Sequence, residues 1–491
     1  MCGRALDAGV WGDKKSGAIP VRAFAGNSDA FAAKLDSSGA LVWNTFLGGN
    51  DFGDSTGVAV DGSGNVYVAG SSATTWGSPV RAFVGGFDGF AAKLNSSGAL
   101  TWNTFLGSSS GDQSFAVVVD GSGNVYVAGS SSATWGAPIR AYTSETDAFA
   151  AKLSSSGALT WNTFLGGSGY ESGYGIAVGG SGNVYLAGTS SGTWGTPIRA
   201  YTGDSDAFAA KMDSGGALLW NTFLGGALFD NGNGIAVDGS ENVYVAGESH
   251  ETWGTPVRAF SGGGDGFAAK LDSSGALTWH AFLGGVFSDR GLGIAVDGSG
   301  NVYAVGSGGV WGTPIRPYTF GGDAYAAKLG SDGALTWNTF LGGSAEDNGY
   351  GIAVDGGANV YVTGRSRATW STPIRKFIGF FDYDAFVGKI PAVTSCAEKP
   401  DKPSLIKPSN LEKVKGPKVK LDWGDTACPA TYEVIVRQGS KTGPIVLKKE
   451  GLTLSEREVK SLSAGVTYYW RVTAKNSFGK IKSLWFSFTV K

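Results

Sequence analysis

The stretch GIAVGGSGNVYLAG at residues 175–188, followed by DAFAAKM at 206–212 and ALLWNTFLGG at 217–226, decides the fold. It contains four apolar runs that are separated by polar or Gly-rich steps, and close copies of it recur along the chain. Short runs in which apolar and polar residues alternate predict β-strands, and Gly-rich steps between them predict hairpin turns. We name the four runs A, B, C and D in chain order.

The C run returns at a nearly constant period. It begins at Asp29, Asp88, Asp147, Asp206, Asp265, Asp323 and Asp384, with steps of 59, 59, 59, 59, 58 and 61 residues. A long period with four strands per unit is typical of a β-propeller blade. Large apolar residues on both faces of the D run favour blades packed face to face, with the D-run Trp between them.

The number of runs bears on how the ring closes. Seven C runs accompany only six complete A, B and D runs, and residues 4–10 are a degraded B candidate. Seven blades would therefore need one more A strand and one more D strand. We expect both to lie N-terminal to residue 4, in a chain whose N-terminus is incomplete or divergent. A six-bladed ring with surplus edge strands is the alternative, and its open edge would favour aggregation.

The repeat, in the form GIAVDGSGNVYVAG, DAFAAKL and LTWNTFLGG, resembles the bacterial SBBP repeat over residues 4–390. The resemblance implies a seven-bladed β-propeller and an extracellular or cell-surface bacterial setting. It implies no single activity, because the same fold carries many functions.

A second domain follows the repeats. We expect the propeller at residues 1–391, a linker at 392–402 and a β-sandwich at 403–491, where strand-like runs such as KVKLDW and TYEVIVRQ replace the repeat. LSAGVTYYWRV resembles the corresponding stretch of a fibronectin type III module. The resemblance implies that Trp423 lies in the core and that the Tyr468 hydroxyl turns onto the backbone near Leu462.

Charge and cysteine content restrict the partners and the compartment. Residues 396–491 hold 18 Lys and Arg against 9 Asp and Glu, whereas residues 1–395 hold 21 against 32. The acidic propeller argues against nucleic acid as its partner. A disulfide between Cys396 and Cys428 would stabilise the small domain by roughly 3–4 kcal/mol, and two unpaired thiols are the alternative. Neither a membrane-spanning run nor a signal segment is visible in the sequence.

An acidic column is the first candidate site. Alignment of the D-to-A loops places Asp112, Glu171, Asp230, Asp289 and Asp347 together, with Asp54 next to the corresponding Gly53. Such a ring at the axial mouth would favour a cation, a basic peptide or a polyol. The alternative is that each acid caps its own turn or pairs with a repeated Arg.

The B-to-C loops supply the second candidate. Their WGxPxR signature repeats a Trp and Arg pair that could bind glycans by ring stacking and by hydrogen bonds. The pairs are Trp76 and Arg81, Trp135 and Arg140, Trp194 and Arg199, Trp253 and Arg258, and Trp311 and Arg316. Structural salt bridges with the repeated Asp are the alternative interpretation of these arginines.

These patterns favour binding over catalysis, because an active site needs asymmetry and the repeats are nearly identical. We predict a non-catalytic, monomeric extracellular propeller that binds a protein or glycan or serves structural display. A propeller lectin and a polysaccharide hydrolase or lyase at the axial mouth are the alternatives. We predict no catalytic residue, metal or cofactor, because the spacing of His250 and His280 fits no standard ligand motif.

Overall fold

The computed structural model describes residues 2–5, 19–375, 377, 383–392, 400, 402–424, 431–452, 456–476 and 479–491. All of its regular secondary structure is β-strand, and none of the described residues forms a helix suited to crossing a bilayer. The chain divides into two compact units, which we describe separately.

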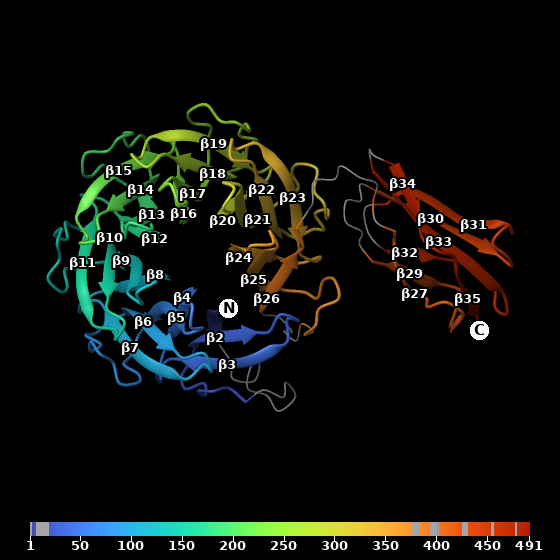
Figure 1. The fold of residues 1–491 in the computed structure, drawn as a ribbon, viewed down its shortest axis with the longest axis horizontal. Helices are drawn as coiled ribbons and strands as arrows, with labels where there is room; N and C mark the ends of the chain where they lie inside the picture. The colour runs from blue at the N-terminus through green and yellow to red at the C-terminus, as the bar shows by residue number, and fades with distance from the viewer. Residues whose placement is uncertain are drawn as a thin grey trace. The chain divides into compact units, whose positions relative to one another are not determined.

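The first unit is a ring of seven antiparallel sheets, or blades, that follow one another in chain order (Figure 1). In each complete blade the A strand lies nearest the axis and the D strand lies outermost. The strands of blades 1 to 4 are β1 Cys2–Ala5, β2 Asp29–Leu35 and β3 Leu41–Leu47; β4 Gly53–Val60, β5 Val66–Ser72, β6 Asp88–Leu94 and β7 Leu100–Leu106; β8 Asp112–Val119, β9 Val125–Ser131, β10 Asp147–Leu153 and β11 Leu159–Leu165; β12 Glu171–Val178, β13 Val184–Ser190, β14 Asp206–Met212 and β15 Leu218–Leu224. Those of blades 5 to 7 are β16 Asp230–Val237, β17 Val243–Ser249, β18 Asp265–Leu271 and β19 Leu277–Leu283; β20 Arg290–Val296, β21 Val302–Gly308, β22 Asp323–Leu329 and β23 Leu335–Leu341; β24 Asp347–Val354, β25 Val360–Ser366 and β26 Asp384–Ile390.

Blades 1 and 7 have three strands each. Strand β1 pairs with β2 from Cys2 opposite Ala32 to Ala5 opposite Asp29, so the B strand of blade 1 lies at residues 2–5 and not at 4–10. Among the described residues, blade 1 has no A strand and blade 7 has no D strand. Ala385 of β26 nevertheless packs against Phe31 and Phe46 of blade 1. The ring therefore has seven blades, as predicted, and the six-bladed alternative is wrong.

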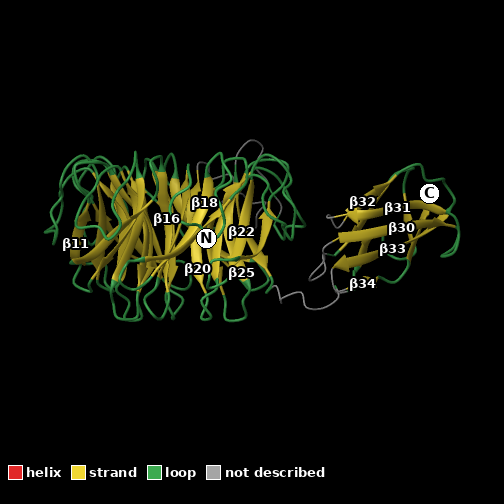
Figure 2. Ribbon diagram, turned by 90° about the horizontal axis from the view of Figure 1, so that it is seen from above, coloured by secondary structure: helices red, strands yellow, loops and turns green. Residues whose placement is uncertain are grey.

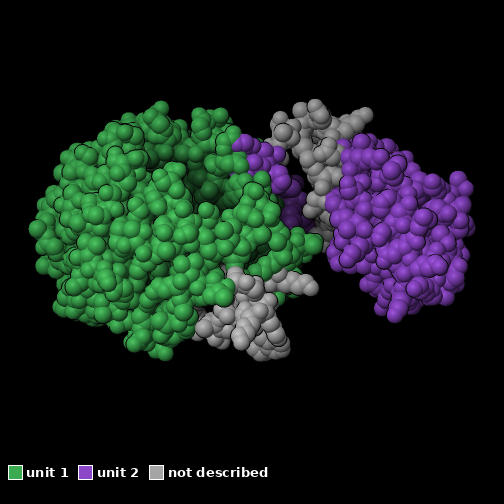
Figure 3. Space-filling view, turned by 60° about the horizontal axis from the view of Figure 1, so that its bottom comes forward, with its two compact units in different colours: residues 1–312, 319–356, 361–389 green, residues 313–318, 357–360, 390–491 purple. Residues whose placement is uncertain are grey.

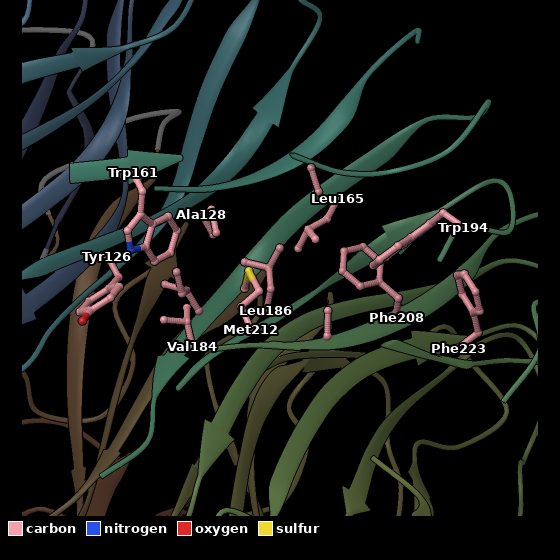
Figure 4. Packing of buried hydrophobic residues seen from close by; sticks show 14 residues of the cluster. Tyr126, Ala128, Trp161, Leu165, Val184, Leu186, Trp194, Phe208, Met212 and Phe223 are labelled. Atoms are coloured by element: carbon pink, nitrogen blue, oxygen red, sulfur yellow. The ribbon is translucent and has the colours of Figure 1, made fainter. Parts of the chain in front are cut away.

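The hydrophobic core lies between blades. One cluster joins Tyr126 and Trp161 of blade 3 to Leu186 and Phe208 of blade 4 (Figure 4). The indole N–H of Trp161 donates to the carbonyl of Ser214, in the C-to-D turn of blade 4, at 3.2 Å. The D-strand Trp residues of blades 1, 2, 4 and 5 bond the next blade in the same way. The predicted packing of the D-strand Trp between blades is thus confirmed.

The long B-to-C loop covers the outer edge of its own blade. In blade 2 the Val80 N–H donates to the Asn103 carbonyl at 2.8 Å, and the Phe105 N–H donates to the Arg81 carbonyl at 3.1 Å. The same two bonds recur in blades 1, 3, 4 and 5. Because an unpaired strand edge can pair with other chains, this loop removes an aggregation hazard. Figure 2 shows the connections gathered on two opposite faces of the ring.

In every described A-to-B turn but one, a partly buried Asp holds the turn by hydrogen bonds to its own blade. In blade 2, Asp61 accepts hydrogen bonds from the Asn65 side chain and the Tyr67 hydroxyl, while the Lys93 ammonium lies 5.1 Å from the Tyr67 ring centre. Blade 4 has Gly179 at the position of this Asp. There Glu241 from blade 5 supplies the carboxylate, accepting from Asn183 at 3.3 Å and pairing with Lys211 at 2.8 Å.

We expect Glu241→Ala, which keeps a Cβ at this left-handed position (φ 62°), to lower the free energy of unfolding by about 1 kcal/mol, because Lys211 and Asn183 lose their acceptor. Adding Gly179→Asp should recover most of this loss, since the Asp returns to its usual place. Urea unfolding of the two single variants and the double variant measures the coupling. Additive losses in the double variant would contradict the exchange of carboxylates between blades.

The second unit contains two facing sheets around one core. One sheet has the order β27 Leu405–Lys407, β29 Val419–Trp423 and β32 Glu456–Val459. The other has the order β28 Glu412–Val414, β35 Phe486–Val490, β33 Thr467–Asn476, β30 Thr431–Gln438 and β31 Ile445–Leu452, with β34 Gly479–Lys482 paired to β33. Trp423 is buried in the core, as the resemblance implied, and the Tyr468 hydroxyl accepts the Ser463 N–H at 2.8 Å. Cys396 and Cys428 lie outside the described residues.

Candidate functional site

The repeated loop Trp residues are buried within their blades. Trp76 is 4% exposed, and its ring packs edge-on against Phe90 and Phe105 at 5.1 and 6.2 Å between centroids. Its carbonyl accepts the side-chain amide of a D-strand Asn, Asn103. The other four, Trp135, Trp194, Trp253 and Trp311, are equally buried. These rings therefore offer no face to a sugar, which corrects the predicted glycan-binding surface.

The loop arginines fasten neighbouring blades. The Arg81 guanidinium donates to the carbonyls of Phe105 and Gly107 at 2.9 and 2.8 Å, and its carbon lies 5.4 Å from the ring centre of Trp135 in the next blade. Arg140, Arg199 and Arg258 repeat this arrangement, and Arg316 is also engaged. Arginine thus combines carbonyl bonds with a cation–π contact. The role is structural, but backbone carbonyls take the place of the expected salt bridges.

The acidic column is also structural. Asp112, Glu171, Asp230, Asp289 and Asp347 are almost completely buried. Each accepts the backbone N–H of the residue four positions earlier: Ser108, Gly167, Gly226, Gly285 and Gly343. The predicted ring of ligand-binding carboxylates is therefore corrected, and the alternative that each acid caps its own turn is confirmed. Asp54 is partly exposed and accepts the Ser71 N–H at 3.2 Å, while Gly53 occupies the buried position.

These carboxyls face a second set, the C-strand Asp residues. A Cβ at Gly225 would lie 2.5 Å from Asp230 Oδ2 and 2.9 Å from Asp206 Oδ1, so both acids lie beside the same glycine. Burial raises the pKa of Asp230 and of Asp289 to about 7, and the neighbouring carboxylates Asp206 and Asp265 add to the shifts. Asp230 and Asp289 are almost completely buried, so neither side chain is exposed to a ligand in solution.

The two histidines have different surroundings. His280 is stacked on Trp253 at 3.9 Å, with Nε2 2.7 Å from the Trp253 carbonyl, in the place of the usual D-strand Asn. Burial lowers the pKa of His280 to about 4, so it is neutral near pH 7. His250 lies beside the Phe229 ring on the loop face, 6.4 Å between centroids. Within the described residues, no three His, Cys, Asp or Glu side chains gather as metal ligands.

A β-bulge in the innermost strands creates a feature that the sequence analysis missed. The register shifts around Thr56, Phe115, Tyr174, Asn233 and Leu292 in five successive blades. A bulge re-aims one side chain, and here it brings neighbouring blades into contact: the Phe115 and Tyr174 rings lie 5.0 Å apart. The chain varies widely in residue type at this column while its flanks stay small, being Gly, Ser or Ala, and that contrast was the available signal.

Several exposed residues differ from the residue type that the other repeats have at the same position. They lie in blades 5 to 7, near the face of the ring that carries the D-to-A and B-to-C loops, which we call the loop face. The sixth position of the B strand is Ser or Thr in most blades, but it is Glu248 in blade 5 and Arg365 in blade 7. Glu248 pairs with Arg290 of blade 6 at 3.0 Å. Tyr350, at the bulge column of blade 7, is 46% exposed, and the Arg365 guanidinium lies 5.7 Å from its ring centre. Blades 5 to 7 thus share a row of charged and aromatic groups. We name this row, which comprises Glu248, Arg290, Tyr350 and Arg365 and the neighbouring Glu346, Arg367 and Tyr383, the mouth sector. Figure 3 shows the hollow at the centre of the propeller unit, in green.

Tyr383 and two arginines complete the mouth sector. The Arg365 and Arg367 guanidinium carbons lie 4.1 and 4.4 Å from the Tyr383 ring centre. The Tyr383 hydroxyl donates to Glu346 at 2.5 Å, and Arg365 lies 3.5 Å from the same carboxylate. The Nε of Arg365 is buried without a hydrogen-bond partner among the described residues.

Exposed apolar residues also occur on the loops of blades 4 to 6. In the D-to-A loops that enter blades 4, 5 and 6 they include Tyr170, Phe229, Val286 and Phe287, and Phe320 lies in the B-to-C loop of blade 6. Exposed apolar side chains that lie next to charged groups are characteristic of interaction surfaces.

Comparisons with known proteins support the propeller. The model of the SBBP β-propeller repeat matches residues 220–252. No curated protein is similar to the chain. A gluconolactonase from Xanthomonas campestris is 14% identical, with a TM-score of 0.30 over 57% of this chain and 78% of that one. A puromycin hydrolase is 14% identical, with a TM-score of 0.33 over 70% of this chain and 52% of that one. The chain is a propeller repeat protein, and these low scores carry no argument about activity.

Proposed function

We propose that the propeller is a non-catalytic binding platform whose ligand, a protein or glycan, sits on the mouth sector. The observation that carries the proposal is the contrast between repeated and variable positions. The repeated Trp, Arg and Asp residues are engaged in packing, whereas Arg290, Tyr350 and Arg367 depart from the repeat and are exposed. Selection for packing alone does not require three exposed departures in one sector.

The mouth sector also has the chemistry of a binding surface. Arginine and tyrosine are the residues most enriched where binding energy concentrates, because both combine apolar contact with hydrogen bonding. Three arginines face two glutamates, Glu248 and Glu346, so the sector is locally basic within an acidic domain. A ligand with an acidic or hydrogen-bond-accepting group beside an aromatic or apolar patch would suit it.

We infer that the second unit is a fibronectin type III-like spacer and that the protein acts at the surface of a bacterium or outside it. The three-stranded and larger sheets around Trp423, together with the Tyr468 corner, support the first inference. The resemblance to the SBBP repeat supports the second. The propeller itself is proposed to act as a monomer.

The test is a binding screen of the whole chain against a glycan array and a panel of purified extracellular proteins. For a ligand found there, we expect Arg365→Ala and Tyr350→Ala each to weaken binding by about tenfold or more, because each removes a contact at the centre of the surface. Phe115→Ala is the matched control, since Phe115 occupies the same column in blade 3 and should leave binding unchanged. A screen without any ligand, or equal loss with Phe115→Ala, would contradict the proposal.

A further inference from the structure

The loop face carries a second feature, at the four junctions between neighbouring blades from blade 1 to blade 5. At each of them, the residue before the A strand forms an isolated parallel bridge with the residue before the C strand of the preceding blade. The bridged pairs are Ser28 with Phe52, Phe87 with Gly111, Thr146 with Tyr170, and Ser205 with Phe229. Each of these junctions therefore has one aromatic residue and one small residue at the same place.

The strand that supplies the aromatic residue changes, but the aromatic residue is kept. It precedes the A strand at three junctions, whereas between blades 2 and 3 Phe87 precedes the C strand and Gly111 takes the other place. A Cβ at Gly111 would meet no atom of the described residues within 4 Å, so this side of the bridge has room for a side chain. The exchange indicates that each junction retains one aromatic ring, whichever side supplies it.

Packing does not explain these four rings, which we name the junction aromatics. Phe52, Phe87, Tyr170 and Phe229 are 44%, 43%, 62% and 54% exposed, whereas the five buried loop Trp residues are each 4% exposed. Exposed side chains contribute little to stability. Exposed aromatic rings that recur at equivalent places are characteristic of a surface that contacts a ligand.

The backbone holds these rings at fixed places between two blades. The Tyr170 carbonyl accepts the Ser191 N–H of its own blade at 3.1 Å. The next residue, Glu171, donates its N–H to the Thr146 carbonyl of the preceding blade at 2.7 Å. The same two bonds recur at the other two junctions where the aromatic residue precedes the A strand. Because a preorganised group loses little conformational freedom on binding, these positions suit a ligand-binding role.

The side chains beside the rings are hydrogen-bonding groups of neutral or negative charge. The Tyr170 hydroxyl donates to Glu145 at 3.1 Å, and the Phe52 N–H donates to Asp51 at 2.9 Å. Asp51 also accepts the Asn27 side-chain amide at 3.3 Å. Neither Lys nor Arg occurs in the segments that form the bridges, which are residues 25–28, 48–52, 84–87, 107–111, 143–146, 166–170, 202–205 and 225–229.

This chemistry suits a neutral ligand that is rich in hydroxyl groups. Phosphates, carboxylates and anionic membranes call for available cations, whereas the loop arginines that reach these segments are engaged by backbone carbonyls, as Arg140 is by Gly166 at 2.7 Å. Quaternary ammonium groups are bound in a cage of several rings, and each junction offers one. A sugar matches both features, since its apolar face stacks on an aromatic ring and its hydroxyls bond to carboxylates and amides.

We propose that the junction aromatics form a multivalent binding surface for a neutral polysaccharide, with a sugar unit stacked on each ring and hydroxyls bonded to neighbouring groups such as Glu145 and Asp51. Repetition over four junctions gives avidity, because every contact after the first is intramolecular. The four junctions lie between blades 1 and 5, whereas the mouth sector belongs to blades 5 to 7. The two surfaces can therefore be tested separately.

The test is affinity electrophoresis of the full chain in native gels that contain dextran, mannan, galactan, arabinoxylan or a mixed-linkage β-glucan. We expect at least one of these polymers to retard the chain. Its free monosaccharide should compete only at a concentration of sugar units that is about a hundredfold higher or more, because it lacks avidity. Polygalacturonate, an anionic polymer, should not retard the chain.

Variants of the junction aromatics locate the binding. Tyr170→Ala should weaken the retardation by about threefold or more, because it removes one of four contacts, whereas Tyr170→Phe keeps the ring and should preserve it. The variant with all four rings changed to Ala should migrate as it does without polymer, with a thermal midpoint close to that of the unaltered chain. Phe320→Ala is the matched control, since Phe320 is 71% exposed in the B-to-C loop of blade 6 but belongs to none of the four bridges.

Absence of retardation by every neutral polymer would overturn the proposal, and so would retardation that survives the change of all four rings. Equal retardation by polygalacturonate would also overturn it. Binding to poly-L-lysine or to phosphatidylcholine vesicles, without binding to any neutral polymer, would assign the junction aromatics to a cationic peptide or to a membrane. The comparison of polymers uses the unaltered chain, so it does not depend on the folding of a variant.

Discussion

We expect Trp194→Ala to lower the free energy of unfolding of the propeller by about 3–5 kcal/mol, the loss typical of a large buried aromatic side chain. Trp194 is 4% exposed, and its ring contacts Phe208 and Phe223. Its loss also removes the ring over which the Arg140 guanidinium lies, at 5.8 Å. The damage therefore extends from blade 4 to the junction with blade 3.

The midpoint of thermal or urea unfolding measures this loss. Phe287→Ala is the matched control, since Phe287 is an exposed aromatic residue of a D-to-A loop and its removal should change stability by less than about 0.5 kcal/mol. A similar small effect for Trp194→Ala would mean that the loop Trp is accessible, and would restore the glycan-binding interpretation.

The second large effect is a fall in propeller stability as the pH rises from about 4 to about 7. Burial raises the pKa of Asp88 and Asp265 to about 6, and that of Asp230 and Asp289 to about 7, whereas the unfolded chain has values near 3.8. Between these limits the folded state binds more protons than the unfolded state, so stability decreases with rising pH and levels off above pH 7. Each such carboxyl contributes on the order of 1 kcal/mol or more to this decrease in the free energy of unfolding.

The carboxylates of the A-to-B turns have pKa shifts of the opposite sign, and they affect stability in a lower pH range. Hydrogen bonds lower the pKa of Asp61, Asp120 and Asp238, so their contribution is lost only as the pH falls below about 4. Urea midpoints at pH 4.5, 6 and 7.5 test the main trend. Asp230→Asn should reduce the slope by the share of one of the four carboxyls, because the amide stays neutral. A midpoint that rises across this range would show that the buried acids are ionised and compensated.

The sequence predicted the architecture well because the same pattern of strands and turns recurs in every blade. The period of the C run located every blade, and the unequal number of runs indicated that the first and last blades have fewer strands, as they do among the described residues. The boundary of the first B strand was wrong, since the weak hydrophobic pattern of residues 2–10 does not determine a register on its own.

The candidate site was harder to predict because residue type does not reveal burial. Asp230 and Trp194 belong to types that are common in binding sites, yet both side chains are buried. The mouth sector depends instead on bulges and on contacts between blades, such as the approach of Arg365 to Tyr350. Such contacts emerge only after strands far apart in sequence have been placed together.

The exchange of a carboxylate between Gly179 and Glu241 has a consequence for how such a gene can change. Most junctions are chemically equivalent, so a recombination event that adds or deletes one repeat would create junctions that still fit. Blades 4 and 5 are an exception, because the turn of one is completed by a side chain of the other. Recombination that keeps these two repeats together preserves the ion pair between Lys211 and Glu241. A crossover between them would separate the lysine from its counter-charge, so we expect selection against it.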